Sequence, residues 1–272
     1  MLPLLLAACT PDLDARAHVA APAPAPVHVP TWPDDPGALH PPPIDVPPDH
    51  RPSTVFLVAG HGARDNEGNL GAWCTREQDF TLRTTDALAH LLASTGQFGV
   101  VRARTGEQRP SYAARLRHLA RSGASLLIEL HSDSRAHSVV QNGTSAAGEP
   151  CWRDDSEPGF TVLVHDRGEA DLVTRRLALA RALALALADT GFPPWVGDYN
   201  GLYEADAVPG VWRDRRNLYM LRQPAVPSVI VETHNARDGR ETLRWDEPAT
   251  RDAFGRAVVT ALLRYERSVR GQ

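Results

Sequence analysis

Lysine is missing from this 272-residue sequence, and cysteine and methionine occur only three and two times. All 29 residues counted as lysine or arginine are therefore arginine, which together with abundant alanine and proline indicates genome composition rather than function. Positive charge is not in excess, since the formal net charge is -4, so nothing indicates nucleic-acid binding. A long uninterrupted hydrophobic run is also missing. The most apolar stretch, residues 172–189, contains three arginines and is expected to be a core-facing helix rather than a membrane span.

Residues 1–9 are similar to the signal segment of bacterial lipoproteins. The apolar residues 2–6 lead into Ala7-Ala8-Cys9, and in such proteins the cysteine is lipidated after cleavage. No basic residue precedes the run, and the run is shorter than the usual ~7–15 residues, which a start codon placed too late would explain. We therefore expect an exported protein of the periplasm or cell envelope, with a lipid anchor on Cys9.

The rest of the chain divides into two parts. Residues 10–53 form a Pro/Ala-rich disordered linker by composition, and residues 54–272 form one catalytic domain. In that domain apolar strands are expected at 53–60, 98–105, 124–131, 159–166 and 227–232. Helices are expected between them at 77–95, 110–123, 172–189 and 248–268. This alternation predicts an α/β fold with a largely parallel twisted sheet sandwiched between helices.

Three of the expected strands end in residues that can bind metal or move protons. The strand TVFLVAG leads to His61, SLLIEL leads to His131, and PSVIV leads to Glu232. The carboxyl ends of parallel strands meet at one edge of a sheet, where the sites of open α/β folds lie. Each residue alone is more often a cap or a surface group, but the coincidence of three such endings favours a common site.

Two imidazoles and one carboxylate form a donor set that suits a single Zn²⁺ ion with an open position for water. Besides Glu232, the candidate carboxylate is Glu77, which begins the helix after the His61 loop. An acid in the first turn of a helix is also explained by the helix dipole. From residue chemistry alone, Glu77 and Glu232 are interchangeable as metal ligand and catalytic base.

The ordered segments VFLVAGHGARD, WCTREQDFTL, LLIELHSDS and SVIVETHN resemble the zinc-dependent N-acetylmuramoyl-L-alanine amidases of the amidase_3 type, from about Thr54 to the C-terminus. The resemblance implies zinc ligands at His61, Glu77 and His131 and a catalytic glutamate at Glu232. It implies cleavage of the amide between N-acetylmuramic acid and L-alanine in peptidoglycan, and hence a role in cell-wall remodelling.

Secondary residues are expected around the site, three from the same resemblance and one from the strand pattern. Arg115 matches an arginine common in its helix, which is structural or faces substrate. His234 and Asn235 stand where the family has an apolar-Gly-Phe pattern, so they are candidate substrate contacts. Glu129 shares a strand face with His131 by the two-residue period, so we expect it to orient that imidazole.

Cys74 and Cys151 form an even pair once a lipidated Cys9 is set aside, and an oxidising compartment would permit a disulfide between them. Three alternatives stay open: a zinc amidohydrolase or peptidase acting on another amide, a non-catalytic wall-binding lipoprotein, and an amidase that requires a protein activator. In the last case the polar residues 135–160 are candidates for a cover over the site.

Overall fold

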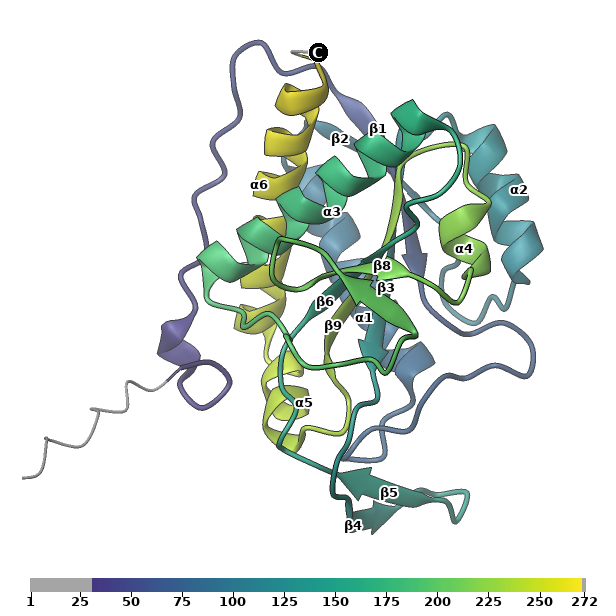
Figure 1. Cartoon of the computed structure of the whole chain (residues 1–272), viewed down its shortest axis with the longest axis vertical. Coiled ribbons are helices and arrows are strands. Elements are labelled where there is room, and N and C mark those ends of the chain that lie inside the picture. Colours follow the sequence, from purple (N-terminus) through teal and green to yellow (C-terminus); the bar gives the residue numbers. More distant parts are fainter. Residues whose placement is uncertain (1–30, 271–272) are drawn as a thin grey trace, which may run out of the picture.

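A seven-stranded sheet forms the centre of the molecule (Figure 1). The computed structural model describes residues 31–270, so the predictions for residues 1–9, including lipidation of Cys9, and for residues 10–30 lie outside the described part. The strand order is β2-β1-β3-β9-β6-β8-β7. Neighbouring strands are parallel from β2 to β9 and between β6 and β8, whereas β6–β9 and β7–β8 are antiparallel. The expected α/β fold with a largely parallel sheet is thereby confirmed.

The strands lie close to the expected positions, with additional short strands in the second half of the chain. Their bounds are β1 Ser53–Ala59, β2 Phe98–Arg102, β3 Leu126–Asp133, β6 Thr161–Val164, β7 Tyr203–Ala205, β8 Val211–Asp214 and β9 Ser228–Asn235. Strands β8 and β7, which are not among the strands expected from the sequence, extend the sheet beyond β6.

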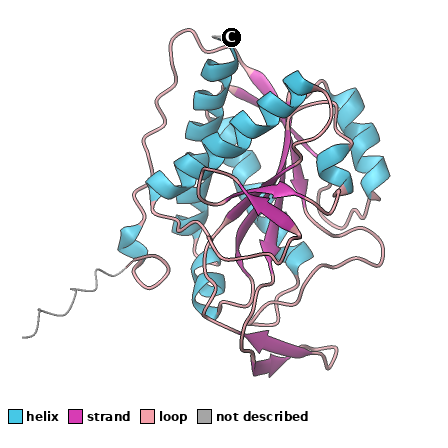
Figure 2. Cartoon of the chain, in the orientation of Figure 1, coloured by secondary structure: helices cyan, strands magenta, loops and turns pink. Residues whose placement is uncertain are grey.

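Helices cover both faces of the sheet (Figure 2). One face carries α1 (Glu77–Ser94), α3 (Ala170–Thr190) and α6 (Pro248–Arg270), and the other carries α2 (Tyr112–Ser122) and the short α4 (Tyr219–Arg222) (Figure 1). Strand β1 shows why two layers form. Its alternate side chains Val55 and Leu57 belong to the larger core, whereas Phe56 and Val58 pack with Leu119 of α2. None of the helices within residues 31–270 combines the length and apolar composition that a bilayer span requires.

The N-terminal segment from residue 31 packs against the domain, which corrects the expected linker for its last part. Trp32 is only 2% exposed and makes edge-to-face contacts with Phe192 and Trp245. The backbone N–H of His40 donates to the carbonyl of Thr190 at 2.8 Å. The segment is rich in proline and forms a short 3-10 turn, η1 (Pro36–Ala38). Composition alone therefore misses one large apolar side chain that anchors an otherwise irregular segment.

Residues 135–160, expected as a polar loop, contain a hairpin of β4 (Val140–Thr144) and β5 (Pro150–Arg153) that projects from one end of the molecule (Figure 1). A disulfide joins Cys151 of β5 to Cys74, whose Cα atom is 5.3 Å away. This is the pairing that the cysteine count suggested. The bond ties the hairpin to the loop that precedes α1. A further short helix, α5 (Gly239–Trp245), follows β9.

Candidate metal centre and active site

His61, Glu77 and His131 converge at one edge of the sheet. The Nε2 atom of His61 lies 3.0 Å from one carboxylate oxygen of Glu77, and the Nδ1 atom of His131 lies 2.8 Å from the other. The two imidazole rings have centroids 4.7 Å apart. One donor atom from each of the three residues lies within 4.8 Å of the others. The structure thus brings together the three residues that the sequence suggested as metal ligands, although they come from the loop after β1, the start of α1 and strand β3.

The backbone at the end of β1 explains the glycines on either side of His61. His61 has a φ of 57° and Gly62 a φ of 66°, so the chain leaves the strand through two left-handed residues. A Cβ atom at Gly60 would lie 2.5 Å from the Leu130 carbonyl oxygen and from the His131 ring, closer than packed atoms can approach. Glycine at position 60 therefore allows the two histidine-bearing strand ends to come together.

Glu77 is the first residue of α1 and is 4% exposed. Its carboxylate accepts hydrogen bonds from the backbone and side-chain N–H groups of Asn69, at 3.0 and 2.8 Å, and from the Ser132 backbone N–H at 3.1 Å. Burial alone would raise the pKa of Glu77, but the hydrogen bonds and positive charge of His131 and His61 hold it well below its usual range. The side chain is therefore an ionised carboxylate with a fixed orientation, as a metal ligand requires.

The orientation of His61 is set by a residue that the sequence reading missed. The Nδ1 atom of His61 lies 2.6 Å from the side-chain oxygen of Asn66, and the Asn66 amide in turn donates to the hydroxyl of Tyr112 at 2.9 Å. An oxygen acceptor at Nδ1 favours the tautomer that carries its proton there. The lone pair of Nε2 then points towards Glu77. Nothing in the local sequence marks a loop asparagine for this role.

Glu129 lies on the far side of the second imidazole. Its Oε1 atom is 3.3 Å from Nε2 of His131, and the side chain is 1% exposed. Neither of its carboxylate oxygens has a hydrogen bond of good geometry within residues 31–270. Burial alone would lower the pKa of His131, but the Glu129 and Glu77 carboxylates raise it well above its usual range. The geometry is that of a carboxylate placed to hold the ring with Nδ1 towards Glu77.

Glu232 reaches the same site from β9. It lies in register with His131 on the neighbouring parallel strand, so the two side chains share one face of the sheet. Both residues line a cavity of about 340 Å³ together with His61 and Glu129. The Oε2 atom of Glu232 is buried without a hydrogen-bond partner in the described chain. Burial raises the pKa of Glu232 well above its usual range, and the nearby Asp133 and Glu77 carboxylates raise it further.

The charge balance of these residues fits a bound cation. Glu77, Glu129 and Glu232 place three carboxylates around two imidazoles, and the ion pairs of the first two within residues 31–270 are made to those imidazoles alone. Glu232 has no ion pair in the same part of the chain. A divalent ion held by His61, Glu77 and His131 would supply the missing positive charge, and a set of two nitrogens and one oxygen suits zinc.

A second cavity, of about 320 Å³, continues from Glu232 away from the three candidate ligands. Its walls include Trp195 and Tyr199 from the segment before β7, Tyr203 at the start of β7, and Arg216 from the loop after β8. The sequence reading did not assign these residues to the site, because they follow no strand-end pattern. They reach it only because β8 and β7 extend the sheet past β6.

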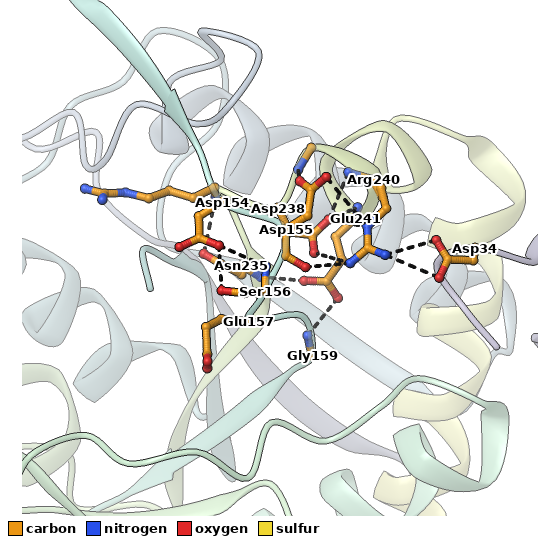
Figure 3. A network of polar contacts seen from close by, with 12 residues as sticks. Asp34, Asp154, Asp155, Ser156, Glu157, Gly159, Asn235, Asp238, Arg240 and Glu241 are labelled. Carbon is orange, nitrogen blue, oxygen red and sulfur yellow. Dashed lines mark hydrogen bonds and ion pairs between the residues drawn. The ribbon is translucent and has the colours of Figure 1, made fainter. Parts of the chain in front are cut away.

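A polar network links the chain after β5, the end of β9 and the N-terminal segment (Figure 3). The Glu241 carboxylate accepts from the backbone N–H groups of Gly159 and Asn235, both at 2.9 Å, and so joins the chain after β5 to the end of β9. Arg240 extends the network to Asp34 of the N-terminal segment, with an ion pair of 3.2 Å (Figure 3). Asn235, three residues after Glu232, is therefore bound into the fold by its backbone.

Arg115, His234 and Asn235, the secondary candidates for substrate contact, are at most 1% exposed and make their contacts inside the fold. For Arg115 this agrees with the structural role, one of its two expected alternatives. Arg115 donates to the carbonyls of Ala59 and His61, at 3.0 and 2.5 Å, and so fixes the end of β1. His234 stacks on the ring of Trp245, and burial lowers its pKa to about 3, so it is neutral. Asn235 caps the backbone of the loop after β3.

Comparison with known families gives one match that spans most of the chain. The sequence profile of the Amidase_3 family, N-acetylmuramoyl-L-alanine amidase, matches residues 55–264. This range contains all four of His61, Glu77, His131 and Glu232. Among curated proteins, none matches the sequence.

Several solved structures share the fold. Ami1, the N-acetylmuramyl-L-alanine amidase of Mycobacterium smegmatis, has a TM-score of 0.63 at 20% identity and covers 80% of this chain and 98% of its own. AmiC2 of Nostoc punctiforme has a TM-score of 0.58 at 18% identity, and the match covers 79% of this chain and 97% of AmiC2. The CwlD amidase of Clostridioides difficile, solved in complex with the GerS lipoprotein, also has a TM-score of 0.58 at 18% identity, covering 79% and 99%. At these identities the likeness shows the fold.

Proposed function

Because the chain belongs to the N-acetylmuramoyl-L-alanine amidase family, whose activity is on peptidoglycan, we propose that it works with one zinc ion held by His61, Glu77 and His131. The observation that carries this proposal is the convergence of the three donor atoms within 4.8 Å at the carboxyl ends of β1 and β3. The excess of buried carboxylate around them supports it, since a cation would compensate that charge.

The reaction is hydrolysis of the amide between the lactyl group of N-acetylmuramic acid and L-alanine. When bound, zinc would lower the pKa of a coordinated water towards ~7 and polarise the amide carbonyl. Glu232 is the proposed base that accepts the proton of the attacking water as the new C–O bond forms. The same carboxyl group then gives that proton to the leaving nitrogen as the C–N bond breaks, so one residue acts as base and then as acid.

The other polar residues of the site act on the ligands. Asn66 and Glu129 are the proposed positioning residues of His61 and His131, respectively, because each contacts the ring nitrogen that does not face Glu77. Fixing both rings reduces the reorganisation required when the ion binds.

The zinc and substrate proposals are tested together on purified protein by metal analysis and by mass spectrometry of digested peptidoglycan. We expect about one zinc per chain, and products that are glycan with a free lactyl carboxylate and peptides with amino-terminal L-alanine. Cleavage at another amide would favour the alternative of a zinc peptidase. Intact peptidoglycan with full zinc content would favour either a non-catalytic wall-binding protein or an amidase that requires a protein activator. Activity without bound metal would contradict the zinc proposal.

Export follows from the substrate, because peptidoglycan lies outside the cytoplasmic membrane. We propose that the chain acts in the periplasm or cell envelope and that Cys9 carries a lipid anchor. The test is the partition of the protein expressed with its own N-terminus, compared with a Cys9→Ser variant. Membrane association of the wild type that the variant loses would support the anchor, and equal partition would contradict it.

A protein activator is a further proposal, which the CwlD–GerS complex of a structural relative motivates.

A further inference from the structure

Arg216 occupies a distinctive position between the two cavities of the site. Together with Tyr203 and Glu232, it lines both the cavity that contains the candidate metal ligands and the cavity beyond Glu232. Its side chain is exposed, so its guanidinium group can meet a ligand in either cavity. A positive charge therefore lines the same two cavities as Glu232, the proposed acid for the leaving nitrogen.

Arg216 differs from the two other arginines of the same segment, which form ion pairs with carboxylates. Arg213 is 2.8 Å from Asp206, and Arg215 is 2.7 Å from Asp166 and 2.6 Å from Glu204. Arg216, by contrast, has no carboxylate within ion-pair distance in the described part of the chain. Two of the three arginines are thus held by structural partners, and the one that faces the cavities is left with its charge available.

Tyr203 adds a second donor at the same place. Arg216 donates a hydrogen bond to the Tyr203 hydroxyl at 2.9 Å, which leaves the phenolic proton free to be donated elsewhere. Burial raises the pKa of Tyr203 to about 12, so that proton is retained at neutral pH. A guanidinium group and a phenolic O–H that line one cavity form a recognition site for an anion, most simply a planar carboxylate.

We propose that Arg216 and Tyr203 bind the free carboxylate of the second stem-peptide residue, and so make this enzyme selective for acidic stem peptides. This inference rests on the proposed function, which places the leaving L-alanine next to Glu232. An extended residue spans about 3.3–3.6 Å, so the side groups of the next residue reach the wall that Glu232 shares with Arg216. A stem peptide in which that carboxylate is amidated offers no charge to the guanidinium group.

The test uses two synthetic muramoyl tripeptides, N-acetylmuramoyl-L-Ala-D-Glu-L-Lys linked through the γ-carboxyl and the same compound with the free α-carboxylate converted to a carboxamide. We expect the zinc-loaded wild type to cleave the carboxylate form with a kcat/KM about 10-fold higher, as a charge-assisted hydrogen bond at a partly exposed site provides. The Arg216→Ala variant should lose this preference, so that its kcat/KM values for the two compounds differ by less than about 2-fold. Arg216→Lys should retain part of it, since the charge remains without the forked geometry. The matched control is Arg121→Ala on the exposed side of α2, which should behave like the wild type.

Binding of the two free tripeptides, measured by calorimetry on the same proteins, separates this proposal from the amidase proposal. A wild type that prefers the carboxylate tripeptide in binding but cleaves neither muramoyl compound would overturn the amidase proposal and leave the carboxylate site standing. Cleavage of both compounds with equal efficiency and equal peptide affinity would overturn the carboxylate site alone. An Arg216→Ala variant that keeps the wild-type preference in cleavage or binding would also overturn it.

Discussion

His131 and Glu232 lie in register on the adjacent parallel strands β3 and β9 and face the same cavity. This pairing places the candidate metal ligand next to the proposed base without any help from a loop. Positions on neighbouring strands of a packed sheet are held more precisely than loop residues. The sheet therefore fixes the relation between this candidate ligand and the proposed base, while the loop after β1 and the start of α1 supply the other two candidate ligands.

The first prediction concerns the contact between Glu129 and His131. A Glu129→Gln substitution keeps the shape of the side chain but removes the charge 3.3 Å from Nε2 of His131. We expect zinc affinity to fall about 10–100-fold, because positioning partners of metal-bound histidines typically contribute this much. Competition with a chromophoric chelator measures the affinity directly, with the exposed Glu107→Gln variant as the control. Unchanged affinity would show that Glu129 does not position the ring.

The second prediction concerns the disulfide between Cys74 and Cys151. It closes a loop across a sequence separation of 77 residues, so its loss should cost about 2–5 kcal/mol of unfolding free energy. The Cys74→Ala/Cys151→Ala double variant and the oxidised wild type would be compared by denaturant unfolding without reductant. Equal unfolding midpoints of the two proteins would mean that the bond does not stabilise the fold.

Trp32 provides a test of the packed N-terminal segment. Its ring is 2% exposed and contacts Phe192 and Trp245, so Trp32→Ala should destabilise the protein by about 3–5 kcal/mol. The control is Trp152→Ala, because Trp152 is 37% exposed and should contribute much less. Urea unfolding measures both. If the two variants unfolded at the same urea concentration as the wild type, residues 31–52 would be a linker after all.

Asp154 should make stability depend on pH in the acid range. Burial alone would raise its pKa, but hydrogen bonds from Ser156, Ser138 and His137 outweigh it and lower the pKa to about 2. A lowered pKa stabilises the folded state above the unfolded value of about 3.9, and this contribution is lost as pH falls through about 2. The unfolding free energy of the wild type should exceed that of Asp154→Asn by about 1–2 kcal/mol at pH 6, and this difference should shrink below pH 4. Denaturant unfolding at several pH values measures the difference, and a constant gap down to pH 2.5 would contradict the assignment.

Much of the fold and the core of the site follow from local patterns. Apolar strands that end in His61, His131 and Glu232 are visible in the sequence, and the rule that sites lie at the carboxyl ends of parallel strands brings them together. The assignment of Glu77 rather than Glu232 as a ligand required either a family resemblance or the fold. Residue type cannot distinguish two glutamates, whereas the hydrogen bonds from Asn69 and Ser132 do.

The weaker candidates for the site differ from its core in their burial. Arg115, His234 and Asn235 are polar residues near site residues in the sequence, yet each is buried and satisfied by the backbone or an aromatic ring. Sequence proximity does not show which way a side chain points once the strand has ended. Conversely, Tyr203 and Arg216 are distant from every motif and reach the site only through the antiparallel edge of the sheet. Contacts of this kind depend on tertiary packing, which local patterns do not encode.

The central claim is that Glu232 performs the proton transfers of an amidase whose zinc is held by His61, Glu77 and His131. The most direct test compares Glu232→Gln with the wild type for both zinc content and the rate of digestion of purified peptidoglycan. We predict that the variant keeps about one zinc per chain and loses about 100- to 10,000-fold in rate, the range that general acid–base catalysis contributes. A variant that digests peptidoglycan at the wild-type rate would contradict the account.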